Sequence, residues 1–419
     1  MYWNDLVFYQ GNEELQRFIE LALIAAASET PIHFHVEGVR GTGKTTLIRA
    51  ARSRLPIIER VQGCPYNCGL DTPHCPEHLD KNSLLESEFI PMPFLEISHS
   101  AKVGTVVGSI DLGRLTSPDN PQAAILPGTL ARAHRGVVFV DEVNRLADTS
   151  PALVDVLLDA MGTKPGRLQI EETGLPMVEI PLGVSIWAAS NPDEEPGPLQ
   201  EIRRQLADRF DFVVHIDRPE RSEIVKAIIN ARRSICQQVN SVGINEIARN
   251  LPFVRLNERV EEFLAELYIR FNLESIRGVQ AAKHGTLLHA AWQKKEIADF
   301  ADLAAVLPAA LRHRLEQGKL IEVVNTLENK IMQENKNNDK HPPISMKKDL
   351  KETNLSGSPT IWNGFWQLLS KQMSNNAERP IDIENPPQTN EASTNSSSSE
   401  KKKIEIMMMG QEEDGDLQN

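Results

Sequence analysis

Short apolar runs alternate with longer amphipathic stretches over the first half of the chain. Three runs, Ile32–Val36, Val137–Val140 and Val184–Ala189, have the length and apolar content of strands buried in a parallel sheet. The stretches between them place apolar residues at helical spacing. This alternation continues to about Arg218 and predicts an α/β domain over residues 1–218, with a parallel sheet flanked by helices.

The pattern changes at Pro219, where strand-like runs stop and helical spacing takes over. Apolar residues recur at this spacing in four segments. These segments are SEIVKAIINARRSICQQV, NERVEEFLAELYIRFNL, GVQAAKHGTLLHAAWQKK and FADLAAVLPAALRHRLEQ. We therefore predict a smaller helical domain over residues 219–332.

Residues 333–419 differ again, because Asn, Lys, Ser, Glu and Pro dominate their composition. Such a segment cannot bury enough apolar surface to offset the entropy lost on ordering, so we predict a mostly disordered tail. One stretch within it, Ile361–Met373, has Trp, Phe and Leu side chains near helical spacing. We expect either a short helix that docks on the folded domains or a helix that binds a partner or a membrane surface.

Composition narrows the class of function. The chain has 419 residues, 40% of them hydrophobic and 25% charged, as in an ordinary soluble globular protein. Its net charge of −13 argues against nonspecific binding to nucleic acid, which favours a basic surface. No apolar run reaches the roughly 20 residues of a membrane span, and no signal peptide is visible. Four cysteines do not form a disulfide framework in so long a chain, so we expect a cytoplasmic protein.

The run GVRGTGKTT directly follows the first predicted strand and precedes a helical stretch. It matches the phosphate-loop pattern G-x-x-x-x-G-K-[ST]. Its glycines let backbone N–H groups turn toward the phosphates of ATP, and the helix N-terminus adds partial positive charge. We expect Lys44 to reach the β- and γ-phosphates and the Thr45 hydroxyl to ligate Mg²⁺. The predicted nucleotide-binding residues of the loop are Gly38, Gly41, Thr42, Gly43, Lys44, Thr45 and Thr46.

The strand Val137–Val140 ends in two acidic residues, Asp141 and Glu142. Carboxylates at the carboxyl end of a buried parallel strand lie over the ligand crevice. We expect Asp141 to hold Mg²⁺ and its waters, and Glu142 to orient or deprotonate the attacking water. The alternative is a pair of solvated acids at the start of a loop.

The strand Val184–Ala189 is followed by Ser190 and Asn191. Asn191 either hydrogen-bonds the attacking water or γ-phosphate, or only forms the turn before Pro192. Phosphoryl transfer also gains from an arginine that neutralises charge on the γ-phosphate. The candidates are Arg203, Arg204, Arg209 and Arg277. Residue type alone does not choose among them, because a single arginine more often forms a surface salt bridge.

Three longer runs extend these motifs: VVGSIDLGRL, ILPGTLARAHRGVVFVDEVNRLADTSPALVDVLLDAM and ASNPDEEPGPLQEIRRQLADRFD. Together they resemble the ATPase subunit, subunit I, of magnesium chelatase, a member of the chelatase and MoxR-like group of AAA+ proteins. The similarity covers roughly Tyr2 to Leu320. It implies that Arg209 is the arginine finger that completes a neighbouring subunit's site. It also implies that Arg277 is the sensor arginine of a helical lid and that Asn191 is the polar sensor.

The same resemblance assigns two inserts and a set of partners. Residues 102–115 look like an insert in the second helix and residues 167–180 like a hairpin, which the turn ETGL between RLQIE and PMVEIP also indicates. ATP sites at subunit interfaces imply a ring, expected to be a homo-hexamer. The expected partners are a sister AAA+ subunit with an integrin-like domain and a large porphyrin-binding subunit that inserts Mg²⁺ into protoporphyrin IX during chlorophyll or bacteriochlorophyll synthesis.

Other functions remain open at this stage. The chain is alternatively an AAA+ co-chaperone that remodels or activates another metalloenzyme, or a nucleotide-gated scaffold with little turnover. Its tail begins like the linker of the sister subunit, so an atypical sister is a further alternative. The intact phosphate loop favours the active ATPase subunit.

The loop 63–78, GCPYNCGLDTPHCPEH, departs from the resemblance. Its cysteines and one histidine have the spacing C-x₃-C-x₆-C-x₂-H, formed by Cys64, Cys68, Cys75 and His78. Three thiols and an imidazole can close a tetrahedral Zn²⁺ site, although the first spacing is looser than in a usual zinc knuckle. Redox thiols and plain loop cysteines are the alternatives. His74 is a weaker candidate ligand, and the fourth cysteine, Cys236, is expected in the core.

Overall fold

The computed structural model describes residues 2–79, 85–116, 124–171, 177–231 and 242–340, with side chains described as far as residue 334. The predicted tail beyond residue 340, its aromatic segment 361–373 and Cys236 lie outside these ranges. Within them, we find no helix with the length and hydropathy that a membrane span requires.

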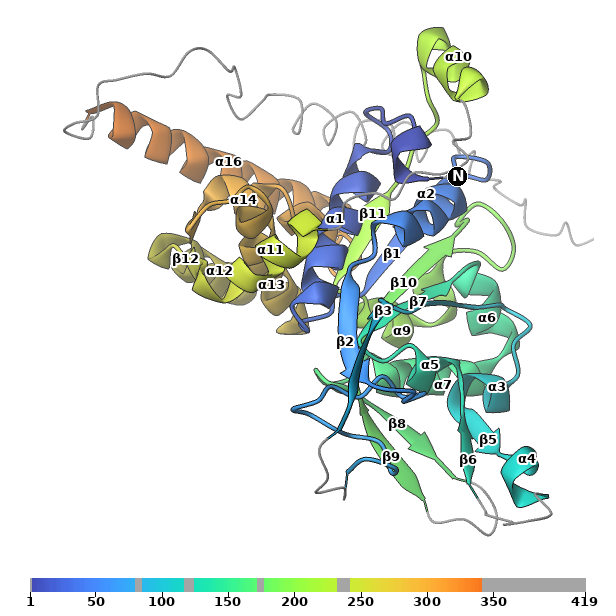
Figure 1. The fold of residues 1–419 in the computed structure, drawn as a ribbon. Helices are drawn as coiled ribbons and strands as arrows, with labels where there is room; N and C mark the ends of the chain where they lie inside the picture. Colours follow the sequence, from blue (N-terminus) through green and yellow to red (C-terminus); the bar gives the residue numbers. More distant parts are fainter. Residues whose placement is uncertain (1, 80–84, 117–123, 172–176, 232–241, 341–419) are drawn as a thin grey trace, which may run out of the picture. The chain divides into compact units, whose positions relative to one another are not determined.

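A five-stranded sheet forms the centre of the first domain (Figure 1). In spatial order its strands are β11 (Phe212–His215), β1 (Phe34–Glu37), β10 (Val184–Ser190), β7 (Gly136–Val140) and β4 (Phe94–Ile97). All neighbouring strands pair in parallel, so their carboxyl ends lie at one edge. The three strands predicted from the sequence are β1, β7 and β10, and the predicted α/β fold with a parallel sheet is confirmed.

Successive residues of each strand face opposite sides of the sheet and enter two separate cores. Phe34, Phe139 and Trp187 pack with the first pair of helices, whereas Val138 and Ile186 pack with a second group. The first pair is α1 (Glu13–Ala27) and α2 (Lys44–Ala50). The second group is α5 (Thr129–Arg132), α6 (Val143–Thr149) and α7 (Pro151–Ala160). Helices therefore cover both faces of the sheet.

Three antiparallel strand pairs extend from this domain. They are β2 (Ile57–Val61) with β3 (Ser87–Pro91), β5 (Gly108–Ile110) with β6 (Ile125–Pro127), and β8 (Gly166–Ile170) with β9 (Val178–Leu182). The last pair is the hairpin predicted at residues 167–180. The segment predicted as an insert, 102–115, contains α3 (Val103–Val107), β5 and α4 (Leu112–Leu115). Two short helices, α8 (Leu199–Ile202) and α9 (Arg204–Arg209), precede β11.

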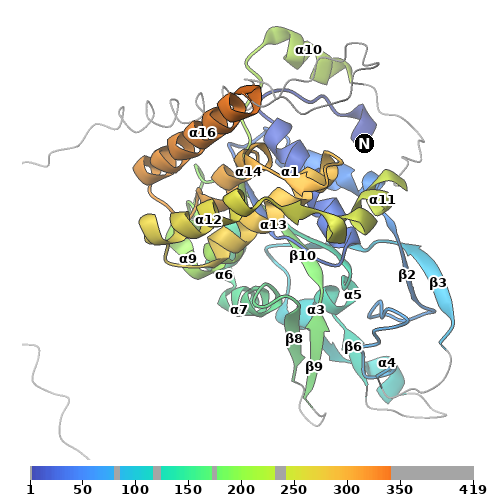
Figure 2. The same ribbon diagram turned by 90° about the vertical axis from the view of Figure 1, so that its left-hand side faces the viewer.

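The second half of the described chain is helical, as predicted. Its helices are α10 (Ser222–Asn230), α11 (Val242–Asn250), α12 (Glu258–Arg270), α13 (Arg277–Trp292), α14 (Phe300–Ala304), α15 (Leu307–Leu311) and α16 (Gln317–Lys340). A small parallel pair, β12 (Arg255–Leu256) with β13 (Ile297–Ala298), joins two of the loops. Figure 2 shows α12, α13, α14 and α16 grouped together.

Two details of these helices differ from the sequence prediction. The segment 300–317 forms α14 and α15 and not one helix, because Pro308 has no N–H to donate to the preceding turn and instead stands in the first turn of α15. Helix α16 continues to Lys340, past residue 332 where we predicted the helical domain to end. Its buried Leu327 packs in the first core, with Ile331 against it, and this anchors the helix that continues beyond them.

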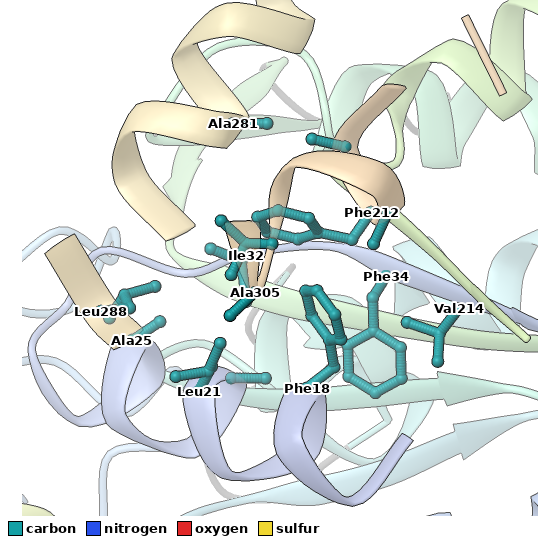
Figure 3. Close-up of a cluster of buried hydrophobic side chains, with 14 of the residues drawn as sticks. Phe18, Leu21, Ala25, Ile32, Phe34, Phe212, Val214, Ala281, Leu288 and Ala305 are labelled. Carbon is teal, nitrogen blue, oxygen red and sulfur yellow. The ribbon is translucent and has the colours of Figure 1, made fainter. Parts of the chain in front are cut away.

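The helical half shares the first core with the sheet (Figure 3). Phe18 of α1 lies against Phe212 of β11, with ring centroids 4.8 Å apart. Helix α13 approaches the same ring through Gly285, where an added Cβ would lie 2.7 Å from Phe212 Cζ. A residue without a Cβ is therefore required at this crossing, and α13 is held against the amino-terminal end of β11.

Candidate functional site

The phosphate-loop segment connects β1 to α2 at the carboxyl edge of the sheet. Gly41 and Gly43 have φ angles of +80° and +92°, which residues with a Cβ rarely adopt. Gly38 lies against β11, since an added Cβ would stand 2.5 Å from the carbonyl oxygen of Ile216. Gly38 and Gly43 are the two glycines of the phosphate-loop pattern, and Gly41 lies between them. The loop conformation therefore requires glycine at all three positions.

Lys44, the first residue of α2, points back into this loop. Its Nζ donates to the carbonyl oxygens of Gly38 and of Val39, the latter at 2.9 Å. Burial lowers the pKa of the ammonium below its ordinary value, and the carboxylates of Asp193 and Asp141 only partly offset this. The ammonium is thus held inside the ring of the loop, where a phosphate oxygen would compete with these carbonyls.

Thr45 and Asp141 meet across the two neighbouring elements α2 and β7. The Thr45 hydroxyl lies 3.1 and 3.3 Å from the two carboxylate oxygens of Asp141. Burial raises the pKa of Asp141, and the hydrogen bond from Thr45 partly offsets the shift. Paired hydroxyl and carboxylate oxygens are donors that suit Mg²⁺, which prefers oxygen ligands and retains several waters. The residues present therefore fit the predicted cation.

Glu142 has a strained backbone, and its carboxylate lies beside an arginine and a histidine. Its φ of +53° lies in the left-handed region, which is uncommon for residues other than glycine and is frequent at functional sites. Arg145 Nη1 lies 3.3 Å from the Glu142 carboxylate and His99 Nδ1 lies 3.7 Å from it. The side chain is about one-third exposed. The carboxylate is therefore partly open to water and is held beside Asp141, at the end of the same strand.

Asn191 follows β10, the strand that lies between β1 and β7. It consequently stands between the loop of Lys44 and the acidic pair. Its side-chain amide donates to Glu194 at 3.4 Å, and its carbonyl oxygen accepts from Asn144 of α6. The structure thus brings together three of the predicted groups, namely the loop, the acidic pair and the polar residue.

Four further residues of this edge were not selected from the sequence. Asp193 and Glu194 place carboxylates near Lys44. The sequence feature that could have identified them is the acidic run that directly follows a predicted strand. His35 and Ser190 link β1 to β10 through a buried 2.8 Å hydrogen bond between Nε2 and Oγ. Burial lowers the pKa of His35 to about 3, and the charge of Lys44 adds to the effect. A neutral histidine therefore lies under the phosphate-loop segment.

The two arginines assigned by resemblance lie at the opposite edge of the sheet. Arg209 ends α9, three residues before β11 begins, and its Nη1 faces Gly162. Arg277 begins α13, and its charge acts on His33, the residue before β1. Because β1 is four residues long, the two edges are about 13 Å apart. The structure does not bring either arginine to the phosphate-loop segment of the same chain.

Arg209 and Arg277 are close to each other. Burial lowers the pKa of the Arg209 guanidinium, and the neighbouring charge of Arg277 lowers it further. Across the described part of the chain, neither guanidinium has a carboxylate within ion-pair distance. The other two candidates differ, because Arg204 pairs with Glu274 at 2.7 Å and Arg203 is exposed. Arg209 and Arg277 are therefore adjacent cations without an ion pair among the described residues, although the charges of Asp208 and Asp159 also act on Arg209.

The cysteine-rich loop also comes together. The ligand atoms of Cys64, Cys68, Cys75 and His78 lie within 4.8 Å of one another, and all four residues are buried. The imidazole of His74 lies outside this set and stacks on His134, with ring centroids 3.9 Å apart. This cluster is separate from the phosphate-loop edge.

The phosphate loop, the acidic pair on the adjacent strand, the polar residue between them and the helical second domain define a P-loop ATPase of the AAA+ class. The family model described as "Magnesium chelatase, subunit ChlI" matches residues 5–194, and that of the AAA lid domain matches residues 261–334. The chain belongs to the magnesium chelatase subunit I family, which confirms the resemblance seen in the sequence.

Known relatives agree with this assignment. The magnesium-chelatase 38 kDa subunit of Acidiphilium rubrum is 32% identical over 321 residues, which cover 73% of this chain and 89% of the relative. The corresponding subunit of Cereibacter sphaeroides is 29% identical over 327 residues, covering 74% and 92%. A crystal structure of a protein from Cytophaga hutchinsonii shares the fold, with a TM-score of 0.50 at 14% identity over 78% of this chain and 91% of that one.

The buried neutral His35 predicts a pH-dependent stability. The folded-state pKa of about 3 lies below the ordinary value of 6.5, so between these values the unfolded chain binds a proton that the folded chain does not. The contribution of neutral His35 to the free energy of unfolding is complete above about pH 6.5 and is lost as the pH falls. The wild-type protein should therefore lose unfolding free energy when the pH falls from 7 to 5. In His35→Asn, which has no imidazole at this position, we expect this loss to be about 2 kcal/mol smaller.

Urea unfolding of both proteins at pH 8, 7 and 5 measures this difference. Between pH 8 and pH 7 the two proteins should change in parallel, which provides the internal control. Equal losses between pH 7 and pH 5 in both proteins would contradict the prediction.

Proposed function

We propose that this chain hydrolyses ATP as the motor subunit of a magnesium chelatase. The observation that supports hydrolysis is the convergence of three strand ends at one edge of the sheet. β1 leads to Lys44, β10 to Asn191 and β7 to Asp141 and Glu142. Each of these groups has a distinct task in phosphoryl transfer, and all of them stand beside one loop.

The phosphate loop and α2 bind the nucleotide. The backbone N–H groups of Gly41, Thr42 and Gly43 and the N-terminus of α2 would receive the phosphates. Lys44 exchanges its two carbonyl partners for phosphate oxygens. Thr45 and Asp141 would hold Mg²⁺, which neutralises charge on the β- and γ-phosphate oxygens when it is bound.

Glu142 and Asn191 act on the attacking water. The Glu142 carboxylate is partly exposed and lies beyond Asp141, so it orients the water and accepts its proton. Asn191 follows the strand that lies between the phosphate loop and the acidic pair. Its side-chain amide forms a hydrogen bond with the γ-phosphate. Arg145 and His99 beside Glu142 fix the direction of the carboxylate.

Arg209 and Arg277 serve a second copy of the chain. Both stand at the amino edge, adjacent to each other and without a carboxylate at ion-pair distance in the described ranges, so each chain completes its neighbour's site and not its own. A closed arrangement in which every chain gives and receives arginines is a ring, which we expect to be hexameric. An arginine supplied in this way stabilises charge on the transferring phosphoryl group.

The chelatase role comes from the relatives, which are named as magnesium-chelatase subunits. In this role, ATP hydrolysis by the ring drives a large porphyrin-binding subunit to insert Mg²⁺ into protoporphyrin IX, together with a sister AAA+ subunit. The porphyrin and the inserted ion are then substrates of the partner.

Substitutions at Lys44 and Glu142 separate binding from turnover. We expect Lys44→Ala to lose Mg²⁺-dependent ATP binding in calorimetry. Glu142→Gln should retain binding and lose turnover by about 10²–10⁴-fold. Asp148→Asn changes an exposed acid on α6, the helix that follows Glu142, and should leave both quantities at wild-type values. Equal phosphate release by wild type and Glu142→Gln would contradict hydrolysis and favour a nucleotide-gated scaffold.

Mixing two inactive variants tests the arginine assignment. Arg209→Ala has an intact phosphate loop, and Lys44→Ala has an intact Arg209. If the arginine acts on a neighbour, each variant alone should hydrolyse ATP at a small fraction of the wild-type rate, and an equimolar mixture should regain part of it. Arg204→Ala removes the salt-bridged neighbour and is the matched control, expected to keep wild-type activity. No recovery in mixtures that form rings would refute action between subunits.

Capture of partners tests the chelatase role. The Glu142→Gln variant, loaded with ATP and Mg²⁺, should retain a large protein from an extract of its native cells, and that protein should bind protoporphyrin IX by fluorescence titration. Lys44→Ala is the control that cannot load nucleotide and should retain less. Retention of a different metalloenzyme, with no porphyrin-binding protein, would favour the co-chaperone alternative.

A further inference from the structure

The loop between β2 and β3 buries three thiols and an imidazole at one point. Cys64 is 1% exposed, Cys68 and Cys75 are 0% exposed, and His78 is 9% exposed. Their ligand atoms lie within 4.8 Å of one another. We propose that this loop binds a structural Zn²⁺ ion through Cys64, Cys68, Cys75 and His78.

The measured separations suit a tetrahedral ion. Bonds of about 2.3 Å to sulfur and about 2.1 Å to nitrogen place the ligands of such an ion about 3.6–3.8 Å apart. Cys64 Sγ lies 3.9 Å from Cys75 Sγ, and Cys75 Sγ lies 3.1 Å from His78 Nδ1. Both separations therefore lie within about 0.5 Å of the values for a tetrahedral ion, and the remaining ligand separations are at most 4.8 Å.

Two tight turns present the ligands in pairs. The first is closed by a hydrogen bond of 3.2 Å from the Asn67 N–H to the Cys64 carbonyl, with Asn67 at a φ of +54°. The second is closed by a hydrogen bond of 3.0 Å from the His78 N–H to the Cys75 carbonyl. A ligand pair from each of two turns is the arrangement by which short loops surround Zn²⁺.

The surroundings accommodate a coordinated thiolate. The backbone N–H of His74 donates to Cys68 Sγ at 3.4 Å. Three thiolates and a neutral imidazole give the ion complex one net negative charge. The guanidinium of Arg60 is directed at this turn, where it donates to the Cys64 carbonyl at 3.0 Å and to Asn67 Oδ1 at 2.6 Å. The same guanidinium pairs with Glu88 at 2.7 Å, so Arg60 ties the ligand-bearing turn to β3, and such outer contacts orient the ligands.

The redox alternative explains fewer of these features. All three thiols are free, and a disulfide would use two of them and leave the third and the imidazole without a role. Reactive cysteines are partly exposed, whereas these thiols have almost no contact with solvent. A zinc ion uses all four groups and needs no solvent access.

The ion would attach the loop to the ATPase domain. The Asn67 side-chain amide donates to the carbonyls of Arg132 and His134, at 2.7 and 3.3 Å, just before β7. Glu77 pairs with Arg114 of α4 at 2.7 Å, and the cysteines join the core that contains α5, α6 and α7. The amino end of β7 is the end opposite Asp141. Zinc binding is therefore structural and independent of the proposed ATPase function.

Metal analysis of the full-length protein tests the proposal. Protein purified under reducing conditions without chelator should contain about one zinc per chain by plasma mass spectrometry. Replacement with Co²⁺ should give the visible absorption of a tetrahedral thiolate site. Cys68→Ser and His78→Ala should contain little zinc. His78→Cys should contain about as much zinc as the wild type, because its thiolate replaces the imidazole as a ligand. Cys236→Ser is the matched control and should retain the wild-type content.

The wild-type measurement decides the question even if Cys68→Ser fails to fold. Absence of both zinc and cobalt binding in the wild-type protein would overturn the proposal. So would equal zinc in wild type and in a folded Cys68→Ser variant. The Lys44→Ala variant should retain full zinc content, so a failure of this site and a failure of the ATPase proposal are distinguishable.

Discussion

The parallel pairing of β1, β10 and β7 is the constraint on which the functional site depends. Strands about 4.8 Å apart place their ends within about 10 Å of one another across three strands. Phe34 pairs with Trp187, and Val137 with Ser185, so all three strands end at nearly the same height. A slip of one residue would turn every side chain to the opposite face and exchange the contents of the two cores. Burial on both faces therefore fixes the register, and the register positions the polar residues.

The same register keeps the helical domain in place. Phe212 of β11 faces the core that α1 and α13 share, and Gly285 lets α13 approach that ring closely. Arg277 begins this helix, two turns before Gly285, so its location follows from the crossing of α13 over β11. Because β11 starts at the amino edge, α13 places Arg277 near Arg209 and away from the phosphate loop.

Local patterns in the sequence predicted most of the site. Phosphate loop, acidic pair and Asn191 were found because each directly follows a predicted strand, and parallel strands align their ends. The hydrogen bond from His35 to Ser190 was missed because it joins residues far apart in sequence. The division of 300–317 depends on how one proline fits a packed helix. At the cysteine-rich loop the spacing of the residues left three interpretations open, namely a zinc site, redox thiols or plain loop cysteines. Only the fold shows that four side chains converge in a buried position.

The two edges of the sheet separate the phosphate loop from Arg209 and Arg277. The carboxyl edge has the phosphate loop, the acidic pair and Asn191, but no unpaired arginine lies there among the described residues. The amino edge has two adjacent arginines and no phosphate-binding loop. A strand is a stiff element of fixed length, so no side-chain rearrangement brings the edges together within one chain. Under the proposed function, Arg209 and Arg277 therefore act on the nucleotide of a second chain, because the length of the strands separates them from the phosphate loop of their own chain.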